Sequence, residues 1–251
     1  YETVADGGHP AMTDTCFGNL FRGCTALGSA PELPATNLTA FCYYSMFEGC
    51  TSLAQTPDLP ATALAMGCYA QMFSGCASLT NTPAILSAMA LESYCYSSMF
   101  EGCTSLTRAP GLPATALANS CYSRMFYGCT GLTTAPVLPA LTLANDCYYG
   151  MFQGCTGLTE APALPAATLA ESCCEKMFFG CTGLTQAPAL PAMTLAGRCY
   201  YEMFRDCEGL TILPALPATN LAEECYAYMF AWCEGVELNT TGPGTPWGIP
   251  D

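Results

Sequence analysis

One phrase returns nine times along the chain with a spacing of 26 residues. It consists of Cys, an aromatic residue, two variable residues, Met-Phe, one variable residue and Gly-Cys, as in CYYSMFEGC at 42–50. The second cysteines of the nine copies occupy positions 24, 50, 76, 103, 129, 155, 181, 207 and 233. A repeat of this length is typical of a solenoid, because a single unit cannot bury its apolar face and must stack on its neighbours. We therefore predict one elongated domain of nine units at 16–235, with a cap or tail at 1–15 and another at 236–251.

Each unit contains signals for a short strand followed by a helix. In the unit 104–129, residues 106–110 suit a strand that ends at Pro110, which has no N–H to donate. Thr115 is a candidate helix N-cap, and Gly128 lies where a helix would end. Counted from the first cysteine as position 0, the recurring residues lie at −4, 0, +1, +4, +5 and +8. These positions cover about half of a helix circumference, so we expect a helix with this face in the core.

These elements predict an α/β solenoid that is curved. Neighbouring strands lie about 4.8 Å apart, whereas packed helices need roughly 8–10 Å. Stacking both in one array should therefore bend it, with short parallel strands on the inside and helices on the outside. The spacing of 27 residues between Cys76 and Cys103 indicates a one-residue insertion in the loop at 85–90, since the flanking phrases are intact.

The nineteen cysteines allow three interpretations. All except Cys174 form pairs eight residues apart. Across a helix that separation is about 12 Å, whereas a disulfide needs Cα atoms within about 7 Å. This favours columns of buried free thiols, which pack as small apolar groups. Disulfides stay open as an alternative because an exported chain meets an oxidising environment. A metal site is disfavoured, since His9 is the only histidine and zinc sites use closer cysteine spacings.

Charge and composition exclude several classes of function. The net charge is −14 with six basic residues, so nucleic acid and anionic lipid should be repelled. No run of apolar residues is long enough to insert in a membrane. No glycine-rich phosphate loop and no His-based constellation is present, so we expect neither an enzyme nor a cofactor.

The phrases MFEGCTSLTRAP and LPATALANSCY are similar to the BspA-like leucine-rich repeats of bacterial surface proteins. The resemblance covers about 16–235 and its Phe-x-Gly-Cys-Thr-x-Leu core is specific. It implies a leucine-rich repeat solenoid, an extracellular or cell-surface location, and a role in adhesion or host interaction. It brings no catalytic motif. No signal or anchor segment is recognisable in the sequence given.

Binding should fall on the half of each predicted helix that varies between units. Exposed Tyr, Trp and Arg dominate binding hot spots, and this half is rich in them. The candidate residues are Tyr44, Tyr94, Arg124, Tyr127, Tyr149, Phe179, Tyr201, Arg205, Tyr228 and Trp232.

The strand face is the rival surface, with Arg108, Glu160 and Gln186 as its candidates. The sequence therefore predicts a secreted or surface-displayed module that binds a protein or a glycan, with a monomer favoured. The alternative is a structural stalk or spacer that has no specific ligand.

Overall fold

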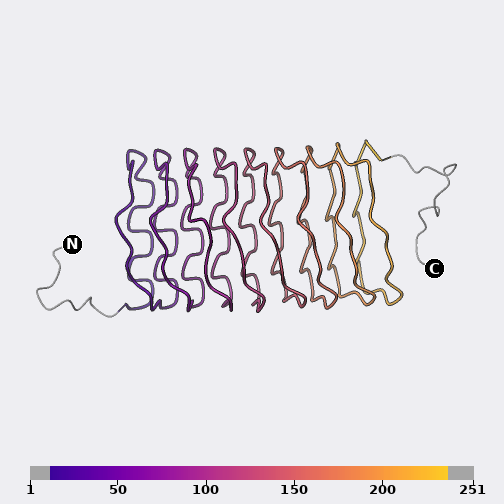
Figure 1. Ribbon diagram of the computed structural model, residues 1–251, viewed down its shortest axis with the longest axis horizontal. Coiled ribbons are helices and arrows are strands. Elements are labelled where there is room, and N and C mark those ends of the chain that lie inside the picture. Colours follow the sequence, from indigo (N-terminus) through magenta and orange to yellow (C-terminus); the bar gives the residue numbers. More distant parts are fainter. Residues whose placement is uncertain (1–11, 237–251) are drawn as a thin grey trace, which may run out of the picture.

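The computed structural model describes residues 12–236 as a solenoid of nine stacked repeats. Figure 1 shows the repeats side by side in a nearly straight row, running from the indigo N-terminal end to the yellow C-terminal end. We number them by their second cysteines: repeat 1 ends at Cys24, repeat 5 at Cys129 and repeat 9 at Cys233. The predicted tail segments 1–11 and 237–251 lie outside the described residues.

The helix prediction is wrong. Residues 119–128 of repeat 5 form a run of overlapping turns, and no α-helix occurs within 12–236. We call the corresponding run in every repeat the turn segment. Three of its residues have a left-handed backbone, at positions −1, +3 and +7; in repeat 5 they are Ser120 (φ 55°), Arg124 (φ 53°) and Gly128 (φ 68°). A left-handed residue every four positions reverses the chain before a helix can propagate.

Backbone hydrogen bonds explain why the turn segment is stable. Its N–H groups alternate between two kinds of acceptor. Cys121 N–H donates to Ala118 O at 3.3 Å within the repeat, whereas Tyr122 N–H donates to Cys147 O in the next repeat at 3.1 Å. Five such bonds, 2.7–3.1 Å long, join the turn segments of repeats 5 and 6. A helix would satisfy every group internally and leave none to hold the neighbouring repeat.

The strand side is also less regular than predicted. Within 12–236 the pairing consists of isolated parallel bridges between consecutive repeats, such as Arg108 with Thr134 and Gln186 with Ile212. A second set of bridges precedes the turn segments, for example Ala90 with Ala116. Backbone hydrogen bonds thus join consecutive repeats on both the strand side and the turn side, so the distance between repeats is similar on the two sides. The stack has no wide helical side to bend it, which accounts for the straight row in place of the predicted curve.

The prediction of which positions face the core is confirmed. In repeat 5, Cys121, Met125, Phe126 and Cys129 are fully buried and Tyr122 is 2% exposed. The phenylalanines at position +5 form one continuous column, with ring centroids 5.4–5.8 Å apart in consecutive repeats and nearly parallel planes. This spacing is far below what two packed helices require.

The cysteines form two columns of free thiols without disulfide bonds, and seventeen of the nineteen are buried. From repeat 2 onward, the Sγ–H of the second cysteine donates to a phenylalanine carbonyl of the preceding repeat; Cys129 reaches Phe100 O at 3.0 Å. The thiol thus adds a hydrogen bond between repeats. The inserted residue at 85–90 is absorbed in its loop, because Cys103 still donates to Phe73 O at 3.2 Å.

The thiols provide a first test. Burial raises the pKa of Cys121 and of Cys181 to about 12, which suppresses the reactive thiolate. We expect an alkylating reagent at pH 8 to modify only Cys16 and Cys24 in the native protein, since these two are exposed. After denaturation without a reductant, all nineteen should react. Nine crosslinked pairs in the peptide map would contradict the thiol columns.

A pair of neighbouring substitutions tests the inward and outward positions. Phe126 is stacked between Phe100 and Phe152, so Phe126→Ala should lower the free energy of unfolding by about 3–5 kcal/mol. Tyr127→Ala, one residue along on the outward side, should cost less than about 1 kcal/mol, the value of an exposed cation–π contact. Urea denaturation measures both, and equal costs would show that the two faces are misassigned.

Candidate functional site: the turn face

The variable residues of the turn segments form the outward surface of one side of the stack, which we call the turn face. None of the ten residues predicted there is buried. Tyr228 and Trp232 are each 59% exposed, and Tyr94 is 47% exposed. The solenoid therefore presents the aromatic side chains that the repeat pattern assigned to solvent.

Arg124 gathers one aromatic cluster on the turn face. Its guanidinium lies 5.2 Å from the ring centroid of Tyr127 and 5.8 Å from that of Tyr149 in the next repeat. The side chain of Arg124 thus joins rings from two neighbouring repeats. Such contacts hold the rings in place while leaving part of each ring open to a ligand.

Arg205 organises a second cluster near the C-terminal end. Its guanidinium lies 4.1 Å from the ring of Trp232 and 5.5 Å from the ring of Phe179. The two rings come from repeats 7 and 9, on either side of the arginine in repeat 8. Stacking of the repeats, rather than any local motif, creates this arrangement.

Tyr201 links the aromatic side chains to a residue that the sequence prediction missed. Arg198 lies 4.2 Å above its ring, and Tyr228 packs edge-on at 5.8 Å. We define the aromatic strip as the rings of these three groups: Tyr127, Tyr149, Phe179, Tyr201, Tyr228 and Trp232. Arg198 is not among the residues predicted from the sequence, although it lies at position −1, as the predicted Tyr94 does.

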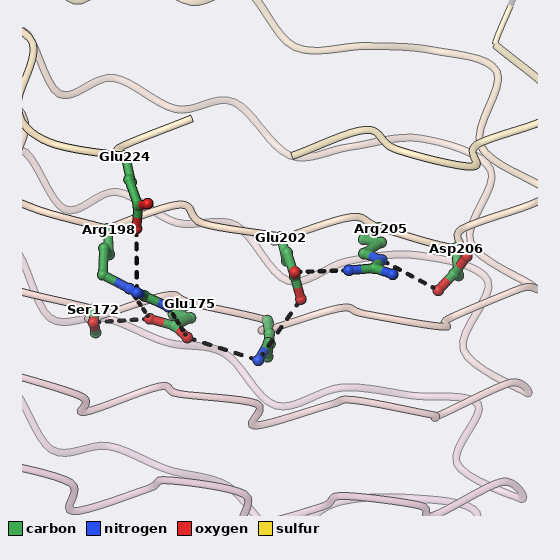
Figure 2. A network of polar contacts seen from close by, with 8 residues as sticks. Ser172, Glu175, Arg198, Glu202, Arg205, Asp206 and Glu224 are labelled. Atoms are coloured by element: carbon green, nitrogen blue, oxygen red, sulfur yellow. Dashed lines mark hydrogen bonds and ion pairs between the residues drawn. The ribbon is translucent and has the colours of Figure 1, made fainter. Parts of the chain in front are cut away.

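Arg198 is held by a buried carboxylate (Figure 2). Its Nε and Nη2 donate to the two oxygens of Glu175 at 3.1 Å each, and Ser172 Oγ donates to the same carboxylate at 2.9 Å. The Glu175 side chain is only 7% exposed. The hydrogen bonds that Arg198 donates to Glu175 raise the pKa of Arg198 above its ordinary value. A bidentate, nearly buried pair of this kind fixes the arginine in one orientation.

The network continues to the second aromatic cluster. Lys176 lies 3.9 Å from Glu175 and 3.7 Å from Glu202, and Arg205 pairs with Glu202 at 2.7 Å and with Asp206 at 3.7 Å. Four carboxylates, including Glu224 on Arg198, therefore surround three cations. Lys176, Arg198 and Arg205 are therefore neutralised within the chain, whereas Arg124, beside Tyr127 and Tyr149, makes no ion pair among residues 12–236. Arg205, which the sequence predicts as a ligand-binding residue, is therefore also the partner of Glu202 and Asp206.

Two predicted residues do not join the strip. Tyr44 packs edge-on against Phe41 at 6.1 Å in repeat 2. Tyr94, in repeat 4, has no ring or cation–π contact among the residues at 12–236. Tyr44 lies at position +2 and Tyr94 at position −1 of the repeat. The repeat period gives these positions but does not show whether a side chain there contacts a ring in another repeat.

The strand face carries the rival candidates. Arg108, Glu160 and Gln186 are all exposed there. Arg108 borders a shallow groove of about 900 Å³ beside the loop with the inserted residue, where exposed Ile85 and Val137 also lie. Arg108 makes no ion pair within the described part of the chain. This groove offers one cation and small polar groups, but no aromatic stack.

The described residues contain no cluster of three or more His, Cys, Asp or Glu side chains suited to a metal ion. Between residues 12 and 236 we also find no helix with the length and apolarity needed to span a bilayer. What the turn face can offer a ligand is therefore ring stacking, apolar contact and hydrogen bonding.

Comparisons with known proteins add distant structural neighbours. No known family profile matches the chain, and no curated protein matches it either. Two solved structures are similar at 15% identity. A leucine-rich cell surface protein from Faecalibacterium prausnitzii aligns with a TM-score of 0.32, over 78% of this chain and 68% of that one. A leucine-rich repeat protein from Bacteroides ovatus aligns with a TM-score of 0.38, over 88% and 86%. Both are bacterial leucine-rich proteins, the class that the repeat phrase resembles.

The buried pair beneath the strip yields a stability prediction. Arg198→Ala leaves the Glu175 carboxylate buried with only Ser172 and the more distant Lys176. We expect a loss of about 1–3 kcal/mol in the free energy of unfolding, less than for a fully buried pair because the arginine is 40% exposed. Arg108→Ala is the control and should change stability by less than about 0.5 kcal/mol. Similar values for the two variants would show that the network contributes nothing measurable.

Proposed function

We propose that the chain is a non-catalytic, surface-displayed binding module that engages a protein or a glycan through the aromatic strip. The observation that carries the proposal is that rings from repeats 5 to 9 pack against Arg124, Arg198 and Arg205. These contacts hold large side chains in fixed positions on an exposed face. A preorganised ring loses little conformational entropy when a partner binds.

The charges around the strip define the chemistry of the partner. Lys176, Arg198 and Arg205 are engaged by carboxylates, and the whole chain has a net charge of −14. Around Phe179, Tyr201 and Trp232 a polyanionic ligand would meet only cations that already have carboxylate partners. Arg124 makes no ion pair among the described residues, and its guanidinium lies over the rings of Tyr127 and Tyr149. Neutral sugar rings can stack on Tyr and Trp, and an apolar protein surface can pack on the same rings. We therefore propose an uncharged glycan or an apolar protein patch as the partner.

The proposed location is the extracellular surface. The repeat phrase resembles bacterial surface proteins, and one structural neighbour is a cell surface protein. A straight, repetitive solenoid suits display at a distance from the cell. Adhesion would follow if the partner lies on another cell or on a host surface.

A test of the strip replaces four rings and leaves the arginines in place. The variant carries Tyr127→Ser, Tyr149→Ser, Phe179→Ser and Tyr201→Ser. Arg205 is kept because it neutralises the nearly buried Glu202, so its loss would also disturb the fold. On an array of neutral glycans and immobilised extracellular proteins, we expect the native chain to bind and this variant to lose at least ~100-fold in affinity, because several anchoring rings are gone.

A strand-face variant is the matched control. Arg108→Ser, Glu160→Ser and Gln186→Ser change exposed residues on the other side of the stack, and affinity should stay as in the native chain. Loss of binding in the control with retention in the ring variant would move the site to the strand face. Circular dichroism confirms that both variants are folded.

The stalk remains the second candidate function, favoured by the straight row of repeats in Figure 1. A spacer needs length and stability but no conserved ligand chemistry. It predicts no binding on the arrays for the native chain and for both variants. The same experiment therefore separates the two functions.

A further inference from the structure

We propose that copies of this chain associate head to tail, with the last repeat of one copy stacking on the first repeat of the next. The inference concerns the two ends of the solenoid and is independent of the aromatic strip. It departs from the monomer expected from the sequence, because the repeat pattern does not show what the two end repeats leave unpaired.

The two ends of the solenoid carry complementary backbone groups. Throughout the stack, alternate N–H groups of one turn segment donate to carbonyls of the following repeat, as Phe17 and Asn19 do to Cys42 O and Tyr44 O. Within the described turn segments this direction never changes, although bonds on the strand side, such as Thr133 N–H to Thr107 O, run to the preceding repeat. Repeat 1 therefore has outward carbonyls and repeat 9 has outward N–H groups.

Within residues 12–236, the carbonyls of repeat 1 that correspond to these acceptors receive no hydrogen bond. They belong to Cys16, Gly18, Leu20 and Arg22. At the other end, no described residue accepts from the N–H groups of Glu224, Tyr226, Tyr228 and Trp232. Unpaired backbone groups in such a row are a template for pairing with another chain.

The backbone conformation of the end repeats favours a second copy of this chain, rather than an ordinary β-strand, as the partner of the outward backbone groups. Glu224, Tyr228 and Trp232 have φ values of 51–57°, so the outward N–H groups follow a segment that turns every four residues. An extended strand cannot follow that path. Repeat 1 has the same turns, with positive φ at Thr15, Asn19 and Gly23, and its carbonyls have the matching spacing.

Side chains at the N-terminal end also lack the cover that other repeats receive. Leu20 is 51% exposed, whereas Met46 at the same position of repeat 2 is 2% exposed. Cys24 is an exposed thiol, whereas Cys50 is buried and donates to Phe21 O at 3.1 Å. A preceding repeat from another copy would cover Leu20 and give the Cys24 thiol an acceptor.

Charge opposes the contact and makes it sensitive to salt. Each copy has a net charge of −14, and the contact would bring Glu223 of one copy near Asp14 of the next. Screening of these charges should strengthen association as the ionic strength rises. Because the two patches differ and the stack is nearly straight, the contact does not close into a ring, and the products should form an open series of oligomers.

Sedimentation velocity of the full 251-residue chain under reducing conditions, from micromolar to millimolar concentration, tests the proposal. We expect dimers, trimers and larger species that grow with concentration and with added salt. Leu20→Asp places a charge in the contact and should weaken association at least ~10-fold. Leu141→Asp changes a leucine that is 62% exposed in the middle of the stack and should leave association unchanged.

Mild oxidation followed by peptide mapping gives the register. The proposed stacking would place Cys24 of one copy beside Cys233 of another, at the equivalent position, so oxidation should form a Cys24–Cys233 link between copies. Repeats 1 and 9 lie at opposite ends of the row in Figure 1, so one chain cannot form this link by itself. A monomer at every concentration, assembly that stops at a dimer, or equal effects of the two leucine variants would overturn the proposal.

Discussion

The hydrogen bonds between turn segments set the distance between repeats, and the rest of the structure depends on that distance. Alternate N–H groups reach carbonyls of the next repeat at 2.7–3.1 Å, which brings equivalent side chains into direct contact. The phenylalanine rings then stack with their centroids 5.4–5.8 Å apart. From repeat 2 onward, the thiol of the second cysteine donates to a carbonyl of the previous repeat. A helix in the same place would have separated the repeats by roughly 8–10 Å and broken both columns.

This arrangement needs left-handed residues, which are unusual outside glycine. Position +7 is Gly in the first seven repeats, but Asp206 and Trp232 occupy it in repeats 8 and 9. Positions −1 and +3 are left-handed throughout, mostly in residues with a side chain. Each such residue costs roughly 1–2 kcal/mol, which the hydrogen bond from its own N–H to the next repeat helps to offset. Some of these residues, such as Arg124 and Tyr228, project from the turn face, whereas others, such as Ser45 and Glu202, are buried.

The turn face shows how a repeat can combine a constant core with a variable exterior. Arg124 and Arg205 each contact rings from neighbouring repeats, and the carboxylates of Glu175 and Glu202 hold the basic residues in place. Burial, together with the nearby charges of Glu175 and Glu171, raises the pKa of Asp146. Carboxylates pair with the cations beside Phe179, Tyr201 and Trp232, which is consistent with a partner that carries no negative charge.

The sequence by itself determined the number of repeats and the recurring residues that face the core. It assigned the variable positions to solvent, but Ser45, Ser98 and Glu202 at position +3 are buried. Cys121, Tyr122, Met125 and Phe126 were placed inward correctly, because burial depends only on which positions recur. It did not determine the backbone conformation. Positions −4, 0, +4 and +8 fit a period of four as well as a helical period of 3.6, and a strict four-residue period with Gly at +7 was the available signal for turns.

Only the tertiary structure decided which exposed residues meet. Phe179, Arg205 and Trp232 come from three different repeats, and their contact depends on the spacing and register of the stack. The pairing of Arg198 with Glu175 joins residues 23 positions apart, which no local pattern indicates. Contacts between side chains of different repeats depend on the hydrogen bonds that set the distance and register of the stack. The sequence pattern indicates only which residues of a single repeat are buried.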